Sequence, residues 1–311
     1  MKPQRKRQAI YAALCCAAAV GIGHVAQFGS DSEVAAPPPQ PLLTAETGMI
    51  EAQSLLEAVR RTIEPEEQEA LSAMPAAVTT NSAANATDPC GRALNTELRP
   101  GALVELALAA SCDAGHVVTI SHGGLTFEDV IGPDGMLSVS VPAIKPAAEF
   151  TVTFEDSASL TAFVMVPDAA HFDRVALQME EAAALSVHAL EFGARPGTSG
   201  HVSPQDPKAP MRAVRAFGGF LTQLGSPEAQ RAEVYSFPSR TTRRDGVVRL
   251  HVEAQVTQAN CGRSLNAEAL QTRKGGGLRR IEVVVDMPGC EAVGDTLVLK
   301  NILQDLKIAA N

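Results

Sequence analysis

The sequence predicts a mostly β protein. An N-terminal transmembrane helix and a linker precede two antiparallel β-sandwich-like lobes, which carry a duplicated disulfide-containing unit. Three observations predict this. One apolar run near the N-terminus is long enough to span a bilayer. Short segments with alternating apolar and polar residues follow residue 90, and a cysteine-centred motif occurs twice. The chain has 311 residues, 45% of them hydrophobic, which suffices for the cores of two lobes.

The membrane anchor is predicted within residues 1–30. A cluster of basic residues precedes an uncharged run from Gln8 to Ser30. Twenty helical residues rise about 30 Å, which matches the hydrocarbon core of a bilayer. The basic cluster keeps the N-terminus cytoplasmic, so we expect a single-pass protein with the bulk of the chain across the membrane. The run continues past Ala17-Ala18-Ala19, which favours a retained anchor over a cleaved signal peptide, although both interpretations stay open.

Residues 31–89 are predicted to form a Pro/Ala-rich linker. The segment Ala35–Pro41 has the composition of a semi-rigid polyproline spacer. Apolar residues between Ala45 and Ile63 approximate one helical face, so a short helix is expected there. The linker would hold the lobes away from the membrane.

Alternating segments predict a β-sandwich lobe over 90–192, a Gly- and Pro-rich connecting region over 193–230, and a second β lobe over 231–311. In Met136–Val141, for example, period-two alternation puts apolar side chains on one face and serines on the other. The strands expected in the first lobe are Leu103–Ala109, His116–Ser121, Met136–Val141, Glu149–Phe154, Leu160–Val166, Arg174–Met179 and Leu185–Phe192. Those expected in the second are Glu233–Phe237, Val247–Val256, Leu278–Val285 and Asp295–Leu299.

The most specific signal is an internal repeat. Cys90–Glu97 and Cys261–Glu268 match at six of eight positions. Each copy continues with an apolar strand and then a second cysteine, Cys112 or Cys290, followed by an acid and an alanine. Outside the cytoplasm such cysteines form disulfides, so we expect Cys90–Cys112 and Cys261–Cys290, each within one copy.

Charge and composition exclude a general nucleic-acid binder, because the net charge is −9 and aromatic residues make up 4% of the chain. Residues 208–280 nevertheless carry 13 basic and 5 acidic residues. Their clustered cations could bind an anionic surface or an acidic partner, or could pair with the acidic first lobe. The candidate anion- or partner-binding residues are Arg240, Arg243, Arg244, Arg273, Lys274, Arg279 and Arg280.

Catalytic chemistry has weak support in the sequence. No Ser/His/Asp set, dinucleotide motif or Cys-x-x-Cys motif is present, so no cofactor is expected and the chain is interpreted as non-enzymatic. One alternative stays open. His188 and Glu191 lie in a predicted strand and His201 in the loop beyond it, and together they could form a metal or catalytic site.

Several segments resemble an uncharacterised family of alphaproteobacterial membrane-anchored periplasmic proteins, some of which carry the provisional label "translocase". The resemblance covers the anchor and most of residues 90–311. It is carried by Cys90-Gly-Arg, Asp173–Gln178, His188–Ala194 and Val298–Ala309. It implies an inner-membrane protein whose bulk lies in the periplasm.

The resulting expectation is a tethered binding or assembly module of the cell envelope. Its partner would be an envelope protein or an anionic surface. The alternative is a periplasmic enzyme or metal-binding protein that uses His188, Glu191 and His201.

Overall fold

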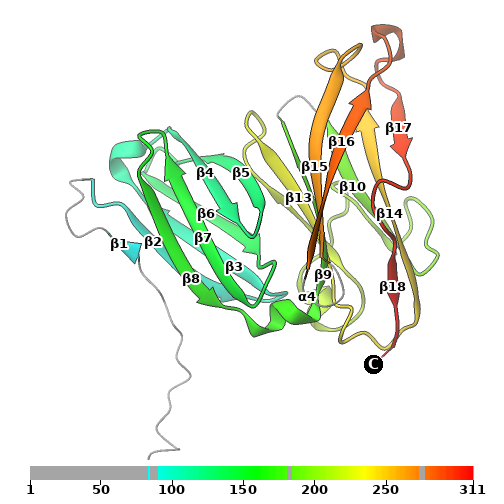
Figure 1. Ribbon diagram of the computed structural model, residues 1–311, viewed down its shortest axis with the longest axis horizontal. Helices are drawn as coiled ribbons and strands as arrows, with labels where there is room; N and C mark the ends of the chain where they lie inside the picture. Colours follow the sequence, from blue (N-terminus) through cyan, green and yellow to red (C-terminus); the bar gives the residue numbers. More distant parts are fainter. Residues whose placement is uncertain (1–82, 85–89, 181–183, 273–276, 311) are drawn as a thin grey trace, which may run out of the picture. The chain divides into compact units, whose positions relative to one another are not determined.

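The computed structural model describes residues 83–84, 90–180, 184–272 and 277–310 (Figure 1). The predicted anchor, nearly all of the predicted linker, Arg273 and Lys274 lie outside these ranges. Within them, no helix is long and apolar enough to cross a membrane.

The described chain is mostly β, with four sheets in which every pairing between strands is antiparallel. Two sheets are built from the strands up to residue 165, and their orders are β1-β2-β3-β6 and β5-β4-β7-β8. These strands are β1 (Ala83–Ala84), β2 (Ala93–Arg99), β3 (Leu103–Ala109), β4 (Val117–His122), β5 (Leu125–Val130), β6 (Met136–Pro142), β7 (Ala147–Phe154) and β8 (Ser159–Met165).

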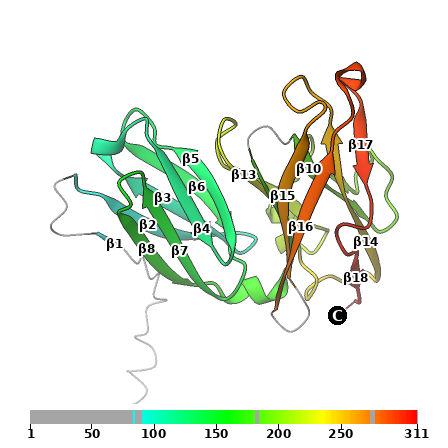
Figure 2. The same cartoon turned by 45° about the horizontal axis from the view of Figure 1, so that its top comes forward.

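The other two sheets use the strands from residue 173 onward, in the orders β12-β13-β9-β15-β16 and β11-β10-β14-β17, with β18 also paired to β14. Figure 2 shows the long β15–β16 hairpin clearly. The strands are β9 (Asp173–Met179), β10 (Leu185–Glu191), β11 (His201–Val202), β12 (Phe220–Leu224), β13 (Arg231–Phe237), β14 (Gly246–Gln255), β15 (Ser264–Thr272), β16 (Leu278–Asp286), β17 (Thr296–Leu299) and β18 (Leu306–Ile308). One short helix, α4 (Met211–Val214), precedes β12.

The grouping of strands differs from the expected one at residues 173–192. The sequence predicts β9 and β10 in the first lobe, but β9 pairs with β13 and β15, and β10 pairs with β14. A short 3-10 helix, Pro167–His171, separates β8 from β9. The region expected as a connection, 193–230, supplies β11 and β12 to the later sheets. Alternating apolar and polar residues identify a strand, but the strands it pairs with depend on contacts distant in sequence. The predicted grouping of β9 and β10 differs from the observed one for this reason.

Inward-facing residues form the cores. In β7, burial alternates along the strand, so Phe150, Val152 and Phe154 point inward. One cluster of buried apolar residues draws on both sheets of the first group and also takes in residues of the second group, among them Ala176, Val234 and Leu270. A second cluster draws on both sheets of the second group. The alternation predicted from the sequence is therefore what builds these cores.

The two copies of the repeat have the same order of elements. In each, a strand begins three residues after the first cysteine, at Ala93 or Ser264, and forms a hairpin with the next strand. A 3-10 helix that contains the second cysteine follows the hairpin, at Ser111–Asp113 or Cys290–Ala292. Another strand, β4 or β17, comes next. The similarity in sequence thus extends to local structure.

His122, at the end of β4, is a buried histidine that is held in its neutral form. Its Nδ1–H donates to the Glu149 carbonyl at 2.8 Å, and its Nε2 accepts the Ile144 N–H at 2.8 Å. The ring stacks on Phe150 with a centroid distance of 4.2 Å. Burial lowers the pKa of His122 to about 4, since a charged ring would lose its hydration.

We expect this histidine to make the fold acid-labile. Because its pKa in the folded state is below the unfolded value of about 6.5, the unfolded chain takes up the proton first as the pH falls. Stability is then lost between about pH 6.5 and pH 4, by about 3 kcal/mol. Urea unfolding at a series of pH values should show this slope, and His122→Gln should flatten it. His171→Gln, at an exposed site, serves as the control. An unchanged slope in His122→Gln would contradict the assignment.

Candidate functional site

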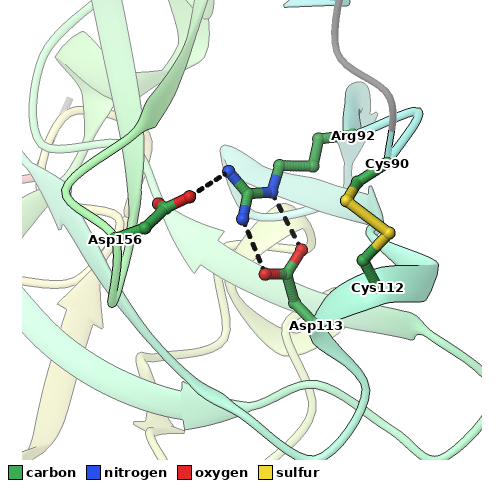
Figure 3. The surroundings of a disulfide bond; sticks show 5 residues. All are labelled: Cys90, Arg92, Cys112, Asp113 and Asp156. Carbon is green, nitrogen blue, oxygen red and sulfur yellow. Dashed lines mark hydrogen bonds and ion pairs between the residues drawn. A yellow bond between two sulfur atoms is a disulfide. The ribbon is translucent and has the colours of Figure 1, made fainter.

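The first disulfide joins Cys90 to Cys112 and lies beside a clamped arginine (Figure 3). Arg92 donates to both carboxylate oxygens of Asp113, at 2.9 and 2.7 Å, and to Asp156 at 2.9 Å. Its guanidinium also lies 4.1 Å from the centre of the Phe154 ring. These bidentate hydrogen bonds hold the start of β2 against the 3-10 helix that contains Cys112. The role of Arg92 is therefore structural.

The second disulfide joins Cys261 to Cys290, with a Cα–Cα distance of 4.9 Å against 5.4 Å in the first. Both pairings are the predicted ones. The arginine differs between the copies, since Arg263 donates to the Ala259 carbonyl at 3.0 Å. The repeated motif therefore fixes the disulfide and the strand start, whereas only the first copy has the carboxylate clamp.

The candidate basic residues do not all stay available to a partner. Arg280 forms an ion pair with Glu268 at 2.8 Å, and the Arg244 guanidinium lies 4.2 Å from the centre of the Phe192 ring. Arg279 is half-buried. Arg240 and Arg243 are exposed on the segment before β14.

Three histidines and a glutamate meet on one face of the β11-β10-β14 sheet. His188 on β10 lies directly across from His251 on β14, and Ser186 lies across from Glu253. His201 on β11 pairs with Leu190 and so shares the face of His188. The opposite face of these strands carries core residues such as Val187 and Val252.

Hydrogen bonds fix the protons in this cluster. The Gly197 N–H donates to His201 Nδ1 at 3.0 Å, so the neutral ring of His201 carries its proton on Nε2. That Nε2–H donates to His188 Nδ1 at 2.9 Å. The His188 proton is then on Nε2, which donates to the Ser186 hydroxyl at 3.1 Å and lies 3.5 Å from Glu253. His251 Nε2 donates to the same carboxylate at 3.1 Å.

Burial keeps the inner histidines uncharged at neutral pH. The side chain of His188 is only 5% exposed, and burial lowers its pKa to about 4. Burial likewise lowers the pKa of His201. Neutral imidazole is the form that can donate a lone pair to a metal ion.

The structure brings His188 and His201 together but places Glu191 elsewhere. An odd separation of three along β10 puts Glu191 on the face opposite His188. Its buried carboxylate accepts from Arg212 at 2.6 and 2.9 Å, from the Gly219 N–H at 2.7 Å and from the Tyr235 hydroxyl at 2.9 Å. Glu191 is therefore a buried structural residue and does not belong to the histidine cluster.

The residues that complete the cluster, His251 and Glu253, were not singled out from the sequence. A usable signal was present, because His251-Val-Glu253 lies in a predicted strand and residues two apart share a face. Their meeting with His188 depends on the register of β10 against β14, which spans more than sixty residues of chain.

The comparisons with known proteins give the cluster no precedent. No protein-family model, curated protein or solved structure matches this chain.

Proposed function

We propose that this chain is a non-enzymatic, membrane-tethered protein of the periplasm that binds or helps to assemble other envelope components. The observation that carries the proposal is that the described cysteines are paired in two disulfides, one in each copy of the repeat. Such bonds persist in oxidising compartments. The basic cluster before the apolar run, in turn, favours a single inner-membrane anchor with the remainder exported.

The proposal includes the finer architecture that the sequence predicts. The linker would act as a spacer, and the lobes would be sandwiches built around a duplicated unit. Exposed cations, with Arg243 the clearest, would contact an anionic envelope surface or an acidic protein through bidentate hydrogen bonds. The activity on this interpretation is binding.

A membrane-impermeant, lysine-reactive cross-linker added to intact spheroplasts tests both location and binding. Lys145, Lys300 and Lys307 are exposed and should react without lysis. We expect discrete cross-linked species that contain this chain and an envelope component. Their yield should fall several-fold in Arg243→Ser at an unchanged melting temperature, because a hydrated surface cation contributes little to folding.

Arg195→Ser, at another exposed loop cation, is the matched control and should leave the yield unchanged. If these lysines react only after lysis, the proposed location is wrong. If they react in intact spheroplasts but form no cross-linked species, the chain is exported and the proposed binding role fails.

A further inference from the structure

The outer face of β10 and β14 gathers metal-ligating groups from two strands. His251 and Glu253 are two residues apart on β14, so their side chains share a face. The antiparallel register places His188 of β10 directly across from His251. Three ligating side chains therefore come from the middle of paired strands, which are rigid supports for a site.

Their spacing fits a metal ion. The ligand atoms of His188, His251 and Glu253 all lie within 4.8 Å of one another. Nε2 of His188 and of His251 lie 3.5 and 3.1 Å from the Glu253 carboxylate oxygens. Ligands bound tetrahedrally at about 2.0–2.1 Å lie about 3.3 Å apart, so only small side-chain shifts are needed to admit an ion.

We infer that His188, His251 and Glu253 form a binding site for one divalent transition-metal ion of the Zn²⁺ class, with His201 as a positioning residue. Two imidazoles and one carboxylate make a donor set that such ions prefer, whereas Mg²⁺ prefers oxygen ligands alone. With three protein ligands, a fourth position stays open to water or to a donor group from a partner.

The site is shielded but reachable. The His188 side chain is 5% exposed, His251 12% and Glu253 27%. The buried imidazole would be held firmly, while the carboxylate side gives an ion a route from solvent. The carboxylate also supplies negative charge to offset the charge of the ion.

Metal binding would reverse the hydrogen bond between the two inner histidines. Coordination through Nε2 moves the His188 proton to Nδ1, which then donates to His201 Nε2. The His201 proton must move to Nδ1, where it faces the Gly197 N–H that now donates at 3.0 Å. The ion should therefore break the Gly197–His201 hydrogen bond, a change that a mere ion-pair cluster would not undergo.

Calorimetric titration of the full-length chain, purified without a polyhistidine tag and stripped of metal, tests the inference with Zn²⁺. We expect one ion per chain and no comparable binding of Mg²⁺. His251→Ala and Glu253→Gln should each weaken Zn²⁺ binding by at least 100-fold, because each removes a ligand. His116→Ala is the matched control. His116 contacts Glu155 at 3.0 Å on the exposed surface, so it presents a histidine–carboxylate pair without a second imidazole.

His201→Asn tests the positioning role. Loss of an outer-shell partner typically weakens metal binding by about 10–100-fold, and we expect the lower end of that range. In the unsubstituted chain, Zn²⁺ should also shift the Gly197 amide resonance in an NMR spectrum. Circular dichroism would verify that each variant is folded. Absence of Zn²⁺ binding, or binding that is indifferent to both His251→Ala and Glu253→Gln, would overturn the inference.

Discussion

Replacing all four paired cysteines with serine is expected to lower the free energy of unfolding by about 7 kcal/mol. The two disulfides close loops with sequence separations of 22 and 29 residues. In the chain-entropy description, each such loop stabilises the fold by about 3–4 kcal/mol, because the cross-link restricts the unfolded chain. A loss of this size approaches the whole stability of a typical protein, about 5–15 kcal/mol.

Urea unfolding measures this loss of unfolding free energy. Tyr235 is the internal optical probe, because the chain has no Trp and this tyrosine is buried. Variants that lack one disulfide, with both of its cysteines replaced, should each lose about half of the total. The bonds are distant in sequence and share no partner, so their effects should add. A change below about 1 kcal/mol in both variants would mean that neither bond stabilises the native protein.

Glu191→Gln should cost about 3–5 kcal/mol, the usual effect of breaking a buried ion pair. The carboxylate side chain is 2% exposed and accepts four hydrogen bonds, two of them from Arg212. A neutral amide cannot compensate the Arg212 charge, and its NH₂ group turns a donor toward other donors. Thermal and urea unfolding would both report the loss.

Tyr235→Phe is the graded control for this cluster. It removes one donor to Glu191 but leaves the ion pair intact, so we expect a loss of about 2 kcal/mol. Because Glu191 lies on the face opposite His188, Zn²⁺ binding should persist in Glu191→Gln under conditions where the variant is folded. An essentially unaltered stability in Glu191→Gln would show that Arg212 finds another partner.

The sequence allowed many strands to be located, but not their partners. The alternation in Leu103–Ala109 gave β3 with its observed bounds. Three further strands, Ala93–Arg99, Leu125–Val130 and Ser264–Thr272, were not predicted, although their inward and outward positions alternate as in the strands that were predicted. The pairing of β9 and β10 with later strands has no local signal in the sequence, so the expected grouping of these strands differs from the observed one.

The candidate site was predictable only in part, because local sequence patterns do not determine which strands pair. His188 and His201 flank one loop, so their proximity follows from local chain geometry. Glu191 was grouped with them by sequence distance, although strand alternation turns it to the other face. His251 and Glu253 enter only through the long-range register of β14 against β10.

The place of β9 in its sheet has a consequence for synthesis. Residues Arg174–Met179 are all buried, and β9 lies between β13 and β15. The strands over residues 93–165 pair only with strands made before β9, although their core also packs against later residues such as Ala176, Val234 and Leu270. β9 itself must wait for residue 264 and beyond, which takes roughly 4–17 s at ordinary translation rates. During that interval β9 presents an open sheet edge that carries the apolar residues Val175, Leu177 and Met179, and such an edge can pair with other chains.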